Sequence, residues 1–184
     1  MIERTRRLVY VAAPLFNVAE REFNARLKRN LLTHTDVFLP QEDGGLIAEL
    51  VANGASASEA AASVFAIDVA AIRRCDALLL VMDGRTIDEG ASVELGIAYA
   101  LKKLCIGLQT DVRRLVLGRN NPMIDCALDV VFASEAALVN WTATQYGVGN
   151  VHGTARNERG EDPVNVSVST KVAKSQWSTS LSGR

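Results

Sequence analysis

Histidine and cysteine are both scarce in this chain. His34 and His152 are the only two histidines in 184 residues, and two imidazoles cannot build a histidine-rich metal centre. Cys75, Cys105 and Cys126 are an odd number and lack the paired spacing of zinc ligands. We therefore expect no metal ion and no disulfide framework. Reduced thiols are typical of a cytoplasmic protein.

Neither an excess of one charge nor a long apolar run is present. The net charge is −1, with a pI near 6.1, so nothing in the composition favours nucleic acid as a partner. No segment approaches the roughly 18 apolar residues that cross a membrane. The basic and then apolar residues 1–16 are too short in their apolar part for a secretion signal. We expect a cytoplasmic protein without a membrane partner.

Continuous apolar runs predict strands that are buried on both faces. Residues 8–12, 77–82 and 104–108 form such runs, and residues 37–40 and 129–133 predict two shorter strands. The length of 184 residues suits one domain with a single core.

Helical patterns alternate with these strands. Asn17 with Glu20, and Ser56 with Glu59, have the spacing of capping boxes, and apolar residues follow each pair at helical intervals. Further helices are predicted over 90–103 and 134–141, and polar turns over 41–45 and 121–123.

This alternation predicts an α/β fold, a flavodoxin-like, doubly wound, five-stranded parallel sheet with helices on both faces. We assign residues 1–146 to this domain. Residues 147–184 are rich in Gly, Asn, Ser and Thr, which predicts a flexible C-terminal tail. Within them, residues 164–169 alternate between apolar and polar and could instead form an edge strand.

The loop and helix after the 77–82 strand contain the strongest candidate site, because ligands of parallel sheets bind beyond the carboxyl ends of strands. Gly90 allows close approach of backbone to a ligand, and Glu94 follows in a helix that is nearly uncharged over 90–100. Most helical glutamates are simply solvated, but a lone carboxylate among apolar residues favours a nucleophile. Asp83 and Asp88, in the preceding loop, could supply a proton or bind a polar substrate.

Two further polar residues each have a structural and a functional interpretation. Asp68 interrupts an apolar stretch of its helix, so it is either a surface charge or a buried group that needs a partner. Tyr10 lies near the end of the first strand, where it is either a core aromatic or a hydrogen-bond donor to the site.

Five short motifs resemble those of the nucleoside 2-deoxyribosyltransferase family. Residues 10–16 (YVAAPLF) are similar to its first-strand motif, and residues 90–96 (GASVELG) to its G-x-x-x-E-L-G pattern. Asp68 and Asp88 stand at the family's spacing before the glutamate, and residues 38–41 and 121–123 also fit. The resemblance runs from about residue 8 to about residue 123.

The resemblance implies a pentosyltransferase of nucleoside salvage that moves 2′-deoxyribose from a deoxynucleoside donor to a free nucleobase acceptor by double displacement. Glu94 would be the nucleophile and form a covalent ester with the sugar. Tyr10 would orient Glu94, and Asp88 would protonate the departing base and deprotonate the incoming one. Such a reaction needs no cofactor and no metal.

The same resemblance implies a set of substrate-binding residues and an oligomer. The positions assigned to the base and the sugar are Asp68, Gln41, Phe16, Gly90, Asn121 and Met123. Among these, Asn121 and Met123 would reach the sugar from a neighbouring subunit, which implies a homo-oligomer with shared sites.

Two alternatives stay open. One is a 2′-deoxynucleoside 5′-monophosphate N-glycosidase, a hydrolase that must bind a phosphate. Residues 12–16 (AAPLF) lack the glycine and arginine that favour a phosphate after the first strand. The other is a nucleoside-sensing domain without catalysis, because a fold alone does not settle function.

Overall fold

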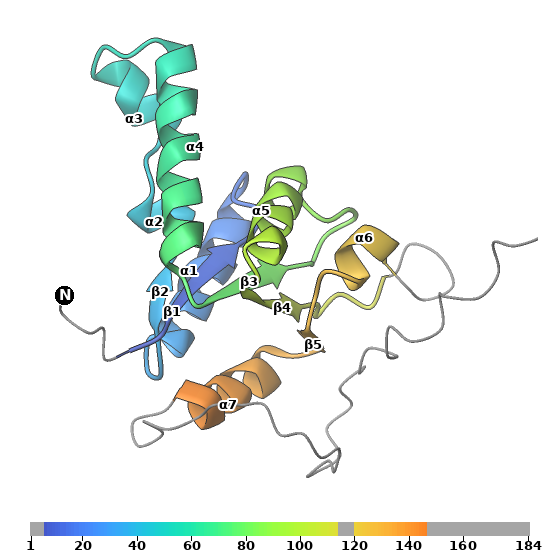
Figure 1. Cartoon of the computed structure of the whole chain (residues 1–184). Helices are drawn as coiled ribbons and strands as arrows, with labels where there is room; N and C mark the ends of the chain where they lie inside the picture. The colour runs from blue at the N-terminus through green and yellow to red at the C-terminus, as the bar shows by residue number, and fades with distance from the viewer. Residues whose placement is uncertain (1–5, 114–119, 147–184) are drawn as a thin grey trace, which may run out of the picture.

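The computed structural model describes residues 6–113 and 120–146 as a parallel sheet between two layers of helices (Figure 1). The five strands lie in the order β2-β1-β3-β4-β5, which confirms the predicted flavodoxin-like α/β fold. Their bounds are Leu8–Ala12 for β1, Asp36–Phe38 for β2, Ala77–Val81 for β3, Leu104–Leu108 for β4 and Val130–Phe132 for β5. The helices are α1 (Val18–Leu31), α2 (Pro40–Asp43), α3 (Ile47–Ala52), α4 (Ala57–Arg74), α5 (Glu89–Ala100), α6 (Pro122–Asp125) and α7 (Glu135–Tyr146).

The core has two layers, one on each face of the sheet. Tyr10, Leu78 and Leu80 point to the face that α4 and α5 cover. Val9 and Leu79 point to the opposite face, which α1 and α7 cover. All five residues of β3 are buried, which explains why its sequence is continuously apolar instead of alternating. Burial of each leucine contributes about 1.5–3 kcal/mol.

Both predicted capping boxes form. The Asn17 side chain accepts a hydrogen bond from the Glu20 amide at 3.0 Å, and the Ser56 hydroxyl accepts one from the Glu59 amide at 3.3 Å. In each case the glutamate side chain returns to the backbone of the capping residue. These bonds begin α1 and α4 where the sequence predicts them.

Three local predictions were wrong. The polar turn over 41–45 is instead the one-turn helix α2, because Pro40 supplies a favourable first helical residue. The strand predicted over 37–40 therefore ends at Phe38. The turn over 121–123 is instead the start of α6, capped by the Asn121 side chain.

The long helix α4 extends beyond the sheet, with α3 beside its first half (Figure 1). Ala71 and Ile72 are buried against the sheet, whereas Val64 and Ile67 are only partly buried. The predicted apolar stripe is thus covered fully only in the half of α4 that crosses the sheet.

Two predictions concern the ends of the chain and its environment. The predicted tail 147–184, with its alternative strand at 164–169, lies outside the described residues. Among the described helices, none is long and apolar enough to cross a membrane.

Candidate active site

A tyrosine and two carboxylates from three separate elements converge beside the sheet. The Tyr10 hydroxyl, from β1, donates a hydrogen bond to Glu94 Oε1 on α5 at 2.6 Å. Asp68, on α4, interacts electrostatically with both of these side chains. We call this group the Glu94 cluster. It forms because β1 is the neighbour of β3 in the sheet and both α4 and α5 cover the same face.

The surroundings of Glu94 raise the pKa of its carboxyl group. Burial raises its pKa from 4.5 to about 7, and the charges of Asp68 and Asp88 also raise it. The hydrogen bond from Tyr10 acts in the opposite direction and favours the ionised form. A carboxylate with these properties is typical of functional sites.

The other two members of the cluster are perturbed in the same direction. Burial and the negative charge of Glu94 raise the pKa of Tyr10 far above its usual value, so its hydroxyl stays protonated and acts as a donor. Burial raises the pKa of Asp68, which the interaction with Tyr10 only partly offsets. Asp68 Oδ1 is buried and has no hydrogen-bond partner within the described residues. A buried oxygen without a partner costs about 1–3 kcal/mol, so it is suited to accept a bond from a ligand.

Asp88 lies at the start of α5 and is also close enough to act on Glu94. Its Oδ1 accepts a hydrogen bond from the Ala91 amide at 2.7 Å and caps the helix. A Cβ atom at Gly90 would lie 3.2 Å from this oxygen, so glycine leaves room for the Asp88 carboxylate. The predicted approach of a ligand to the backbone at Gly90 stays a prediction.

Gln41 contacts α1 with both ends of its amide. Its Oε1 accepts a hydrogen bond from Asn24 at 3.1 Å, and its Nε2 donates one to the Arg21 carbonyl at 3.0 Å. Asn24 is 1% exposed and also donates to the Pro14 carbonyl at 2.8 Å, so it joins Gln41 to the loop after β1. Asn24 is not among the predicted residues, because its only signal in the sequence is an amide among the apolar positions of α1.

The other predicted residues are exposed or are hydrogen-bonded to loops and helix ends. Phe16 is 75% exposed, and Met123 is 80% exposed. Asn121 caps α6 by accepting a hydrogen bond from the Met123 amide at 2.9 Å. Asp83 accepts hydrogen bonds from Thr110 and from the backbone of the loop after β4, so it joins two loops.

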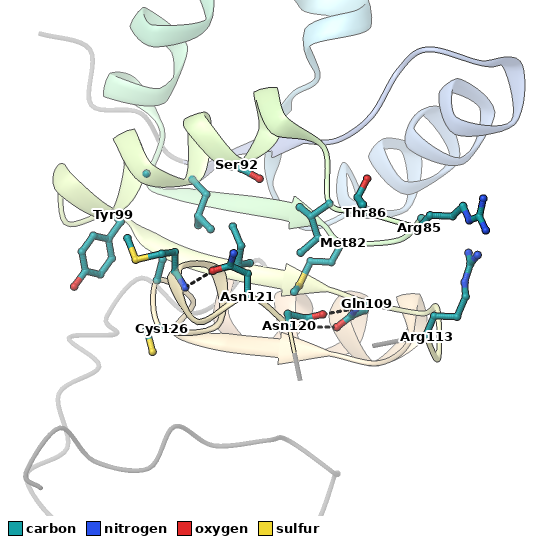
Figure 2. Close-up of a pocket in the computed structure, with 17 residues that line it drawn as sticks. Met82, Arg85, Thr86, Ser92, Tyr99, Gln109, Arg113, Asn120, Asn121 and Cys126 are labelled. Atoms are coloured by element: carbon teal, nitrogen blue, oxygen red, sulfur yellow. Dashed lines mark hydrogen bonds between the residues drawn. The ribbon is translucent and has the colours of Figure 1, made fainter. Parts of the chain in front are cut away.

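A cavity of about 820 Å³ lies on the side of α5 that faces α6 (Figure 2). Asn121 and Met123 line it, whereas Tyr10, Asp68 and Glu94 do not. The residues predicted to touch the sugar from a neighbouring subunit therefore line a cavity that no member of the Glu94 cluster lines. Within residues 6–113 and 120–146, no three His, Cys, Asp or Glu side chains are grouped so that they could bind a metal ion.

Solved structures with the same fold include two that are named for one activity. A 2-deoxyribosyltransferase from Bacillus psychrosaccharolyticus is 23% identical with a TM-score of 0.55, over 72% of this chain and 90% of that one. A 2-deoxyribosyltransferase from Leishmania mexicana is 24% identical with a TM-score of 0.52, over 76% and 99%. A conserved protein from Enterococcus faecalis V583 is 24% identical with a TM-score of 0.61, over 76% and 99%. At these identities the likeness shows the fold.

The family is shown by the sequence itself. Residues 9–166 match the family model described as nucleoside 2-deoxyribosyltransferase. No curated protein sequence matches the chain at a significant level. The chain belongs to the nucleoside 2-deoxyribosyltransferase family, which is a family of enzymes.

Proposed function

We propose that this protein is a nucleoside 2-deoxyribosyltransferase, which exchanges the nucleobase of a 2′-deoxynucleoside through a covalent intermediate on Glu94. One observation carries the proposal. A partly buried carboxylate accepts a 2.6 Å hydrogen bond from Tyr10 beside the sheet of a fold shared with deoxyribosyltransferases. Burial raises the pKa of that carboxylate to about 7, and carboxylates perturbed in this way are typical of functional sites.

The first displacement would cleave the donor. Glu94 attacks the anomeric carbon, the N-glycosidic bond breaks, and its electron pair leaves with the base. Asp88 gives a proton to a ring nitrogen of that base, so the base departs neutral. The sugar then remains as an ester of Glu94. The Tyr10 hydrogen bond occupies Oε1, which leaves Oε2 as the attacking atom.

The second displacement would reverse these events with a new base. Asp88 removes a proton from the acceptor base, whose nitrogen attacks the anomeric carbon and releases Glu94. Two inversions at one carbon retain the anomeric configuration. Every proton and electron pair is exchanged between the sugar, the two bases and the side chains.

Substrate recognition would depend on the residues around this centre. Asp68 has a buried oxygen without a hydrogen-bond partner among the described residues, and it would accept a bond from the base. Gln41, Phe16 and Gly90 would line the same pocket. Gln41 would have to exchange one of its contacts with α1 for the base.

We further propose a homo-oligomer in which neighbouring subunits complete each site. Asn121 and Met123 line a cavity that Glu94 of their own chain does not line, which supports a role in the site of another chain. The high exposure of Met123 supports this arrangement.

The test is base exchange without any added cofactor. The protein is incubated with deoxyinosine and adenine, and in parallel with thymidine and adenine, and deoxyadenosine is measured by chromatography. Formation of deoxyadenosine in either mixture supports the proposal. Release of free sugar with no new nucleoside would identify a hydrolase, and binding without turnover would identify a sensor. Either of these results would refute transfer.

Glu94→Ala should abolish exchange, because it removes the carboxylate that accepts the 2.6 Å hydrogen bond from Tyr10 and would carry the sugar. A fluorinated sugar analogue should leave a covalent adduct on Glu94, detectable by mass spectrometry of peptides. Near-normal exchange by Glu94→Ala, or an adduct on another residue, would contradict the nucleophile role.

Asp88→Asn should slow exchange by about 10²–10⁴-fold if proton transfer limits the rate. Asparagine caps helices as well as aspartate does, so α5 should begin normally in this variant. The loss of rate would therefore report the proton. A loss of less than tenfold would leave Asp88 with a role in positioning alone.

A further inference from the structure

Helix α4 has one side that the rest of the chain covers and one side that is open. On the covered side, Ala71 and Ile72 are buried against the sheet. Further along the same side, Val64 and Ile67 face the loop before α3, because a Cβ atom at Gly45 in that loop would lie 3.5 Å and 3.4 Å from them. The first half of α4, with α3 beside it, extends beyond the sheet (Figure 1). The open side of this helix therefore faces away from both the sheet and α3.

The open side of α4 is apolar along most of its length. Ala62, Ala66 and Ala70 follow one another at intervals of four residues, so they lie on one side of the helix, and all three are exposed. Phe65, next to Ala66 in the chain, is 61% exposed. Between the first and last turns, the one charged side chain is Asp68, which belongs to the Glu94 cluster. A helix face in water normally carries charged and polar side chains, so this face is suited to contact with another surface.

The two ends of this open face carry opposite charges. Glu59 lies in the first turn of α4 and Arg73 in the last, and both are exposed. Each is seven residues from Ala66, which is nearly two full turns, so the three residues lie on the same side. Lys103 Nζ donates a hydrogen bond to the Arg73 carbonyl at 2.8 Å and adds a second positive charge to that end. Charges of these signs stabilise the ends of any helix, but that benefit does not explain the uncharged surface between them.

A second copy of α4 fits this face when it runs in the opposite direction. With Ala66 on the two-fold axis, residue 59 of each chain meets residue 73 of the other, so Glu59 and Arg73 form an ion pair at each end of the contact. Ala62 then lies opposite Ala70 of the other chain. Such small side chains allow two helix axes to approach to about 8 Å. The contact extends over about 21 Å of each helix.

We propose that the open face of α4 binds the same face of a second copy of this protein, in an antiparallel dimer with two-fold symmetry. The placement of the charges favours this occupant, because a two-fold contact needs a surface that is complementary to itself. The inference goes beyond the shared site of the proposed function, since Glu94, Asn121 and Met123 take no part in the contact. It can be tested without any substrate.

The first experiment is sedimentation velocity of the full chain over a range of concentrations, without nucleoside or base. The natural protein should form dimers or larger assemblies with an even number of chains. Ala66→Glu places two like charges at the two-fold axis and should weaken association at least about a hundredfold. Ala136→Glu is the matched control, because Ala136 is exposed on α7, which covers the opposite face of the sheet. This control should associate like the natural protein.

Charge reversal gives a second experiment, whose result misfolding cannot imitate. Arg73→Glu and Glu59→Lys should each weaken association about tenfold or more, because each makes both end contacts repulsive. When the two variants are mixed, they should associate with each other, since every end contact of the mixed dimer joins opposite charges. Glu59 also accepts a hydrogen bond from the Ser56 amide in the capping box, so the rescue, and not the single loss, is decisive. Arg29→Glu is the control for Arg73→Glu, because Arg29 likewise lies in the last turn of its helix, α1.

Three results would overturn the interface. The first is a natural protein that is monomeric at every concentration, which would leave this face to a different partner. The others are unchanged association of folded Ala66→Glu, and no association between Arg73→Glu and Glu59→Lys when both are folded. Circular dichroism and melting temperature verify the fold, and the charge reversal decides if Ala66→Glu unfolds. A dimer without base exchange would refute the proposed function and leave this inference intact, whereas base exchange by a monomer would support transfer and overturn this inference.

Discussion

Glu94→Gln should stabilise the fold at alkaline pH. The side chain is nearly isosteric, and its Oε1 can still accept the Tyr10 hydrogen bond. The pKa of Glu94 rises from 4.5 to about 7 on folding, so between these values the folded chain binds more protons than the unfolded one. The free energy of unfolding therefore falls as the pH rises through this interval, and the penalty is complete above about pH 7.

The size of the effect follows from the same two values. Each pKa unit corresponds to about 1.4 kcal/mol, so ionised Glu94 destabilises the fold by roughly 3 kcal/mol at pH 8. Urea denaturation of the natural protein and of Glu94→Gln, at pH 4 and pH 8, measures the difference. We expect the advantage of the variant to grow by up to about 3 kcal/mol between the two pH values.

A control separates this effect from general acid sensitivity. Glu22→Gln removes an exposed carboxylate from α1, and its difference from the natural protein should change little with pH. The reasoning would be refuted if the advantage of Glu94→Gln were the same at pH 4 and pH 8, or if the natural protein were the more stable at pH 8.

The remaining predictions concern the pH profile and the packing. In the natural protein, kcat/KM for the donor should fall below about pH 7 as Glu94 becomes protonated. The hydrogen bond from Tyr10 favours ionised Glu94, so Tyr10→Phe should raise the pKa of Glu94 and move this fall in kcat/KM to higher pH. An unchanged pH profile would show that Tyr10 does not influence the ionisation of Glu94. Gly107→Ala should destabilise by about 1–3 kcal/mol in thermal unfolding, because the new Cβ would lie 2.8 Å from the Met82 sulfur. Gly96→Ala, in open space on α5, should instead stabilise by about 0.5–1 kcal/mol, and the same sign for both would contradict the packing.

The sheet could be predicted from the sequence because its strong signals are local. Interior strands buried on both faces are continuously apolar, as in residues 77–81, and capping boxes such as Asn17 with Glu20 are complete within four residues. The short helices α2 and α6 could not be predicted in this way. Each consists of one turn that begins at a proline, and proline is equally frequent in turns.

The candidate site was predictable in part for a different reason. The family motifs pointed to Tyr10, Asp68 and Glu94, and the structure brings these three side chains together. The cavity beyond α5 left no such trace, because Arg85, Gln109 and other lining residues come from separate loops and become neighbours only through the order of the strands. The side of α5 that each residue faces also depends on packing against β3, which local patterns do not reveal.

The two outermost strands of the described sheet, β2 and β5, have only three residues each. Such short edge strands offer few unpaired backbone groups to another extended polypeptide, whereas the longer, more hydrophobic strands are paired with a neighbour on both sides. At high concentration this part of the molecule should therefore resist the growth of fibrils for as long as it stays folded.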